Sequence, residues 1–518
     1  MLPPLSARAT RSLLRPSTVS AIRRASTAAA PGPVTRVTTL PNRVRVTTEA
    51  SPGHFHAVGV YVDAGSRFES QRTSGASHLL DRLAFKSTDK HSDEEMMTLI
   101  DQLGSQITCS SSRETIMYQS TVFPQSLDLA MSLLSSTILH PLLLPEELEA
   151  QKAAAAYEIR EIWAKPELIL PEIMHTVAFK DNTLGMPLLC PESQLDVLGD
   201  AEIRGFMRDW YRPERIVVSG VGMPHEELVG LAEKHFGIVP ASSETHVQSS
   251  LRPGASAQPL GAKGFATVVN PPLESDRHLA AAKAVYTGGE EYMLKPEEEF
   301  VHLYIGFEGL GVHDPDIYAL ATLQTLLGGG GSFSAGGPGK GMYTRLYTNV
   351  LNRYHAVDYC AGFHHCYADS GLFGIAMSVY PQFAGSVANI IAHQLDTLTR
   401  PQKGGISQIE LLRAKNMLKS QLVMALESRL TAVEDLGRQT QIHGHKVPVE
   451  EMCAKIDALT IDDLHRTATR VLRPSSRTVP LNYGLGSGEP TIVAQGQVEA
   501  LGDVRGTLRA WGLGKQPF

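Results

Sequence analysis

A segment rich in Ser, Pro, Gly and Ala, at residues 241–280, divides the chain into two parts of similar length. Such a composition supplies few side chains for a packed core and is typical of a linker. The flanking parts, 34–240 and 281–518, each have the length of one large domain, whereas 518 residues exceed what a single core usually holds. The sequence therefore predicts two domains joined by a linker.

Both parts open with the same succession of predicted elements. In the first part, a strand pattern at residues 54–62 precedes a helix pattern through His78. In the second, a strand pattern at 300–307 precedes a helix pattern at 314–327, and a long helical pattern occupies 450–472. We therefore predict an α+β fold class, with two similar domains that each hold a mainly antiparallel sheet packed by helices.

The N-terminal region has the composition of a targeting segment. Residues 1–48 contain no Asp or Glu and are rich in Arg, Ser, Thr and Ala. This pattern is typical of a mitochondrial transit peptide, so residues 1–33 are predicted to be a transit peptide and leader, cut near Arg24-Ala25-Ser26. The formal net charge is −7, and it becomes more negative once this basic leader is removed. An acidic protein favours basic partners and disfavours nucleic acid.

Cysteine usage and hydropathy exclude further classes. The five cysteines are odd in number and lack Cys-x-x-Cys spacing, which disfavours a disulfide framework and a structural zinc ribbon. No apolar run reaches the length of about 18 residues that suggests a membrane-spanning helix. A soluble protein of a reducing compartment is therefore expected.

The helix pattern through His78 carries an incomplete metal motif. A zinc protease of the inverted type needs His-x-x-Glu-His, in which both His ligate zinc and the Glu takes a proton from the metal-bound water. Here the sequence is His78-x-x-Asp81-Arg82, and the arginine stays protonated and offers no lone pair. Glu158 remains as a distal acid, but two ligands are too few for a catalytic site. We expect no metal and no catalytic residue in this chain, with Asp81 and Arg82 in ordinary charge pairs.

A glycine-rich loop is the most specific motif of the chain. Eight of the fourteen residues from Gly328 to Gly341 are glycine. The loop does not match a phosphate-binding loop, because Ser334 stands where the first Gly is required and Gly341 follows Lys340. It is either a flexible connector or a mobile lid whose open backbone groups pair with an extended peptide. The candidate substrate-binding residues are Gly328, Gly329, Gly330, Gly331, Ser332, Phe333, Gly336, Gly337, Gly339, Lys340 and Gly341.

These motifs together resemble one family. The segment around His78 is similar to the active-site helix of the inverted-motif zinc proteases that include mitochondrial processing peptidases, insulin-degrading enzyme and the core proteins of the cytochrome bc1 complex. The stretches 158–168 and 211–215 agree with that family. The glycine-rich loop, with its flanks 314–320 and 345–347, resembles the loop of the processing-peptidase alpha subunits.

The resemblance implies a role and a partner. It implies a non-catalytic subunit in the mitochondrial matrix, paired as a heterodimer with a catalytic beta subunit that carries the intact motif and the zinc. It implies that the glycine-rich loop and acidic residues bind the basic presequences of imported precursors. Among the acids, Glu158 and Glu161 are candidates near a central cavity, although solvated helix faces explain them equally well, and Asp369 is a further candidate.

Three alternatives stay open. A structural core subunit of the bc1 complex at the inner membrane would share the fold and the broken motif, and one protein can serve both roles. A self-sufficient metallopeptidase is disfavoured by Arg82. A nucleotide-binding protein is disfavoured by the failed match to a phosphate-binding loop.

Overall fold

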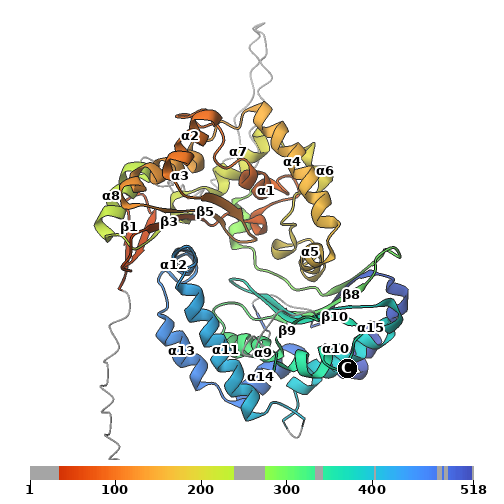
Figure 1. Cartoon of the computed structure of the whole chain (residues 1–518). Coiled ribbons are helices and arrows are strands. Elements are labelled where there is room, and N and C mark those ends of the chain that lie inside the picture. Colours follow the sequence, from red (N-terminus) through yellow and green to blue (C-terminus); the bar gives the residue numbers. More distant parts are fainter. Residues whose placement is uncertain are drawn as a thin grey trace, which may run out of the picture.

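The computed structural model describes residues 34–237, 275–332, 342–401, 404–474, 481–482 and 488–515. The predicted transit peptide and leader at 1–33 and the linker residues 241–274 lie outside the described residues. Within them, two domains made of sheets and helices face each other (Figure 1). None of the described helices is long and apolar enough to cross a membrane.

The first domain is built on a six-stranded sheet with the order β1-β2-β6-β3-β5-β4. Only β2 and β6 run parallel, and all other neighbours are antiparallel. The central strands β3 and β6 are buried along their whole length because both faces of the sheet are covered. The strands are β1 (Thr35–Thr39), β2 (Arg45–Glu49), β3 (His56–Val62), β4 (Ile107–Ser111), β5 (Ile116–Val122) and β6 (Ile216–Val221).

The second sheet has the order β7-β12-β8-β11-β10-β9 and repeats this topology in five of its strands, whereas β9 lies at the edge opposite to that of β1. Its only parallel pair among the described strands, β7 with β12, corresponds to β2 with β6 of the first sheet. The next strands, β8, β11 and β10, correspond in that order to β3, β5 and β4. The predicted α+β class with two similar domains is therefore confirmed. The strands are β7 (Gly289–Leu294), β8 (Val301–Gly309), β9 (Gly329–Gly331), β10 (Val357–Cys366), β11 (Gly371–Val379) and β12 (Thr491–Gly496).

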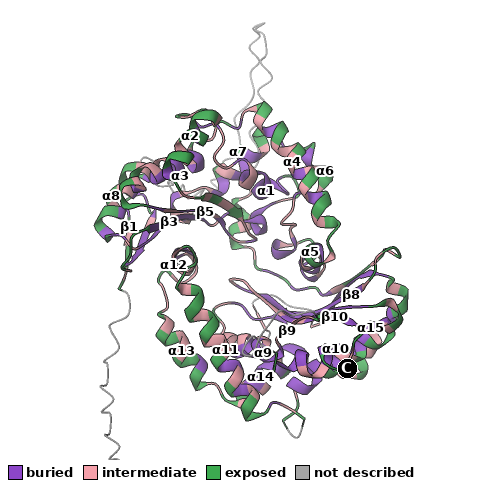
Figure 2. Ribbon diagram, viewed as in Figure 1, coloured by how far each residue is buried: buried purple, intermediate pink, exposed green. Residues whose placement is uncertain are grey.

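Helices cover the outer faces of both sheets, and buried residues gather where helix and sheet meet (Figure 2). Their starts follow local rules: α2 begins at a capping box in which Ser92 and Glu95 satisfy each other's backbone N–H groups. The first domain contains α1 (Ala76–Arg82), α2 (Asp93–Leu103), α3 (Leu127–Leu139), α4 (Pro145–Trp163), α5 (Pro166–Ala178), α6 (Glu192–Leu195), α7 (Asp200–Trp210) and α8 (His225–Phe236). The second contains α9 (Ile317–Leu327), α10 (Ala384–Leu398), α11 (Gln408–Leu426), α12 (Arg429–His443), α13 (Val449–Ala458), α14 (Ile461–Leu472) and α15 (Val504–Ala510).

The long helical pattern at 450–472 is two helices, α13 and α14, rather than one. The break follows from Thr460, whose side chain accepts a hydrogen bond from the backbone N–H of Asp463 and starts a new helix. The sequence contained this signal, a Thr three residues before an acid, but the continuous apolar spacing concealed it.

Each domain contributes one helix that packs on the sheet of the other domain. Helix α12 of the second domain packs on the inner face of the first sheet, with Val433 and Leu436 against Ala57 and Val221. Helix α5 of the first part packs on the inner face of the second sheet, where its apolar residues meet β8, β11 and β12. Figure 1 shows both helices lying between the sheets. Because each domain completes the core of the other, the arrangement of the two sheets is fixed by packing.

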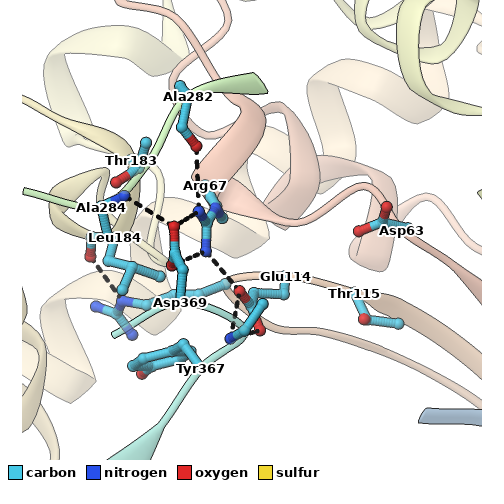
Figure 3. A network of polar contacts seen from close by, with 12 residues as sticks. Asp63, Arg67, Glu114, Thr115, Thr183, Leu184, Ala282, Ala284, Tyr367 and Asp369 are labelled. Carbon is cyan, nitrogen blue, oxygen red and sulfur yellow. Dashed lines mark hydrogen bonds and ion pairs between the residues drawn. The ribbon is translucent and has the colours of Figure 1, made fainter. Parts of the chain in front are cut away.

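A buried polar network joins the domains beside α5 (Figure 3). Arg67, in the 3₁₀ turn Ser66–Phe68, donates to both carboxylate oxygens of Asp369 at 2.7 and 2.6 Å and to Glu114 at 2.7 Å. Glu114 in turn accepts from the backbone N–H of Ala368, and Asp369 accepts from that of Ala284. The turn between β10 and β11 is thereby held in the first domain.

Candidate functional site

The incomplete metal motif lies on α1, and the structure shows how that helix is positioned. Its N-cap residue Gly75 has a φ of +91°, and a Cβ there would lie 2.4 Å from the Sγ of Cys190. The buried carboxylate of Glu69 accepts from the backbone N–H groups of Gly75 and Ser77 at 2.7 and 2.8 Å. The helix start is therefore fixed by a side chain, as helix termini require.

His78 and Arg82 converge on the same carboxylate. The Nε2 of the buried His78 lies 3.4 Å from Glu158, and the guanidinium of Arg82 forms an ion pair with the same oxygen. The other ring nitrogen of His78 accepts from the backbone N–H of Cys190 at 3.2 Å. Burial lowers the pKa of His78, which favours the neutral ring. A cationic side chain therefore lies where the motif would otherwise hold a metal.

Asp81, at the position of the general base, is turned to the neighbouring strand. Its Oδ2 accepts from the backbone N–H and the hydroxyl of Ser111 in β4, at 2.7 and 3.0 Å. The residues present do not fit a zinc ion, because Arg82 replaces a ligand and Asp81 is engaged elsewhere. Among the described residues, no group of three His, Cys, Asp or Glu side chains could hold a metal ion.

The glycine-rich segment begins as an edge strand of the second sheet. Gly329, Gly330 and Gly331 form β9 and pair with Ala361, Cys360 and Tyr359 of β10, in that order. Gly329 has a φ of +96°, and a Cβ there would lie 2.0 Å from the carbonyl oxygen of Cys360. Glycine is therefore required for β9 to approach β10 so closely.

A cavity of about 440 Å³ lies between α5 and the inner face of the second sheet, directly beside β9. Tyr304, Phe363 and Met174 form much of its apolar lining, and Glu167 and Asp358 contribute carboxylates. Burial lowers the pKa of His302, another lining residue, so this imidazole stays neutral at pH 7. The lining contains no Lys or Arg among the described residues, which makes the cavity an acidic and aromatic one.

The two carboxylates reach the cavity for different local reasons. Glu167 is in the first turn of α5, after Pro166, where acidic side chains are favoured by the helix dipole. Asp358 is at an irregularity in β10, where the register with β11 shifts between Val357 and Tyr359, and such bulges redirect a side chain. Its carbonyl oxygen accepts from the backbone N–H of Ser332 at 2.6 Å, so backbone pairing with the glycine-rich segment extends to Ser332.

The structure places the predicted site residues in three separate locations. Gly328–Ser332 lie beside β10, whose residues Tyr359 and Ala361 line the cavity, whereas Phe333, Gly336, Gly337, Gly339, Lys340 and Gly341 lie outside the described residues. Glu158 is bound by Arg82, and Glu161 is exposed on α4.

Asp369 occupies a different environment from the one expected. It is 6% exposed and holds Arg67 with both oxygens. Burial raises the pKa of this carboxyl, but Arg67 outweighs burial and leaves the pKa below its usual value. Within this chain, therefore, Asp369 joins the domains rather than facing an open acidic surface.

Glu167 and Asp358 were missed by the sequence analysis. No spacing signal marks Asp358, because its position at the cavity follows from the register shift in β10. Glu167 carries no such signal, since only the packing of α5 on the second sheet brings it to the cavity.

Comparison with known families agrees with these observations. Residues 45–192 match the model described as insulinase, peptidase family M16, and residues 200–418 match the peptidase M16 inactive domain.

Individual relatives cover nearly the whole chain. The mitochondrial-processing peptidase subunit alpha of Neurospora crassa is 44% identical, over 93% of this chain and 91% of the relative. The probable subunit alpha of Schizosaccharomyces pombe is 40% identical over 92% and 89%, and the human subunit alpha is 33% identical over 90% and 83%.

Proposed function

This chain belongs to peptidase family M16 and, within it, to the family of mitochondrial-processing peptidase alpha subunits, and from this premise we propose that it is a non-catalytic, substrate-recognising subunit. A beta subunit of the same peptidase, carrying zinc and the intact motif, is the proposed partner in a heterodimer. The proposed substrates are the basic presequences of imported precursors, and the proposed location is the mitochondrial matrix.

One observation carries the recognition role. The open edge strand β9 lies directly beside a cavity that combines aromatic side chains with the carboxylates of Glu167 and Asp358. An extended peptide offers backbone groups to a sheet edge and side chains to a neighbouring pocket. Arginine side chains suit such a pocket, because they pair with carboxylates and stack on aromatic rings.

The absence of catalysis in this chain rests on the geometry of α1. Arg82 neutralises Glu158, and Asp81 is held by Ser111, so neither acid is placed to activate water. Peptide hydrolysis is therefore assigned to the partner, where a zinc-bound water would supply the nucleophile. This chain contributes binding energy and orientation, which are separate requirements of catalysis.

The test is a binding measurement on the full-length chain. Fluorescence anisotropy would follow a labelled peptide rich in Arg and Leu and free of acidic residues. The double variant Glu167→Gln with Asp358→Asn should bind several-fold more weakly at low salt, since each solvent-exposed ion pair contributes roughly 0.2–1 kcal/mol. The difference in affinity between the double variant and the unaltered chain should shrink at high salt, because exposed charges are then screened.

A matched control separates a local effect from a general loss of negative charge. Glu233 is exposed on α8, far from α5 in Figure 1, and Glu233→Gln should bind as the unaltered chain does. Equal binding by the double variant would exclude this cavity as the site. A chain that does not bind the peptide, with or without a beta-type partner, would overturn the recognition role itself.

A further inference from the structure

Helix α5 separates two cavities, one on each of its faces. Glu167, Pro171 and Met174 line the first cavity. The opposite face of the same helix, including Ile173, lines a second cavity of about 550 Å³. The rest of this second cavity comes from the end of α4, the segment 187–192 and the edge strand β7.

The second cavity has an apolar interior. Ile159, Trp163, Leu189 and Met293 face it from the surrounding elements. An aliphatic or aromatic side chain of a ligand would exchange water for these apolar side chains here, which is the main source of affinity in such pockets.

The charged groups at this cavity leave one carboxylate available. Arg160 pairs with Glu192 at 2.9 Å, and Glu172 is held by Arg113 at 2.5 Å. Glu291, on the edge strand β7, is exposed and makes no ion pair within the described residues. The free charge at the rim is therefore negative.

The surface around the rim has the same character. Trp163, which lines the cavity, is 44% exposed, so apolar surface continues from the interior to the rim. The Nζ of Lys295 lies 3.5 Å from the carbonyl oxygen of Trp163, which brings the end of β7 against the end of α4. The rim thus combines exposed apolar surface with an unpaired acid.

We propose that this second cavity binds an apolar side chain of the presequence, next to a basic residue that pairs with Glu291. The inference rests on the proposed function and adds a second subsite to it. A presequence that alternates basic and apolar residues would engage both faces of α5, with arginine at the first cavity and leucine or phenylalanine at the second. The occupant follows from charge complementarity, because the rim is acidic and the interior apolar.

Trp163 provides a direct probe of occupancy. The chain has three tryptophans, of which Trp210 is 1% exposed and Trp511 packs against the second core, so Trp163 is the most exposed. Binding of an unlabelled peptide of Arg, Leu, Ala and Ser to the full-length chain should shift tryptophan emission to shorter wavelength. Trp163→Phe should abolish this shift while the labelled form of the peptide still binds by anisotropy. A peptide in which every Leu is replaced by Ser should bind about tenfold or more weakly.

Two further variants address the subsite. Thr176→Phe fills the cavity from α5. Glu291→Lys reverses the charge at the rim, and because Glu291 is exposed, this substitution should not disturb the packing of the chain. Both variants should weaken binding of the Leu-containing peptide. Thr176→Phe should affect binding of the Ser-substituted peptide less. Glu233→Lys is the matched charge control, and thermal unfolding shows whether each variant is folded.

The outcomes separate this inference from the recognition role. Peptide binding without a Trp163 response, and with unchanged affinity in Glu291→Lys, would overturn the second subsite and leave the recognition role standing. No binding of either peptide to the chain, alone or with its partner, would overturn the recognition role.

Discussion

Arg67 and Asp369 are bound by two parallel hydrogen bonds across the domain boundary, at 2.7 and 2.6 Å, with both side chains less than a tenth exposed. The pair lies where the turn between β10 and β11 enters the first domain (Figure 3). It holds the β10–β11 turn against the first domain, and β10 lines the first cavity together with α5 of that domain. The ion pair is therefore a determinant of the site's shape although it does not line the site.

Asp369→Asn should lower the free energy of unfolding by up to about 3–5 kcal/mol, because removing the bidentate partner of a buried pair leaves the charge on Arg67 compensated by Glu114 alone. Denaturant unfolding would measure this loss. Asp101, exposed on α2, is the matched position, and Asp101→Asn should be neutral. A loss of under 1 kcal/mol at Asp369 would show that Glu114 alone satisfies Arg67.

Gly329→Ala should detach β9 from β10, because the new Cβ would lie 2.0 Å from the carbonyl oxygen of Cys360. Cleavage of a presequence peptide by the reconstituted heterodimer should fall several-fold, with little change in the unfolding temperature of the chain. Gly404 has the same φ of +96° and open space around it, so Gly404→Ala reproduces the backbone strain without the clash. Equal effects of the two substitutions would mean that β9 pairing is irrelevant to cleavage.

Arg82→His should create a zinc site, because a second imidazole would then stand one turn from His78 and face Glu158. Metal analysis after dialysis should find about one zinc per chain in the variant, removable by a chelator, and essentially none in the unaltered chain. Arg82→Gln, which removes the charge without adding a ligand, is the control. Zinc binding by the unaltered chain would contradict the assignment of Arg82 as the group that excludes the metal.

The free energy of unfolding should fall as the pH drops from about 6.5 toward 4. Burial and the neighbouring His365 lower the pKa of His364 to about 4, from an ordinary value of 6.5. Between these values the unfolded chain binds a proton that the folded chain does not, so acidification favours unfolding. His364→Phe keeps the ring beside Phe373 and should flatten this dependence by up to about 1.4 kcal/mol per pH unit. Parallel stability curves for the two proteins would contradict the assignment.

The sequence was sufficient for the architecture because each element carries its own local signal. The predicted strands at 54–62 and 300–307 are β3 and β8, and the predicted helix at 314–327 is α9. The echo between the two halves also proved informative, since five strands of each described sheet follow the same order and only β1 and β9 lie at opposite edges.

The site was less predictable because it depends on contacts distant in sequence. Glu167 reaches the cavity only because α5 crosses to the second sheet, and Asp369 is withdrawn from solvent only because Arg67 lies opposite it. Neither relationship is visible in the spacing of residues along the chain. The incomplete metal motif at His78 could be recognised in the sequence, but the pairing of Arg82 with Glu158 could be identified only from the structure.

The most direct test of the account is cleavage of a fluorescent presequence peptide by this chain alone, by a purified beta-type partner alone, and by their mixture. The account predicts no cleavage by this chain, little by the partner, and rapid, chelator-sensitive cleavage by the mixture. Chelator-sensitive cleavage by this chain alone would contradict the account, because it would mean that Asp81 and Arg82 do not disable the site.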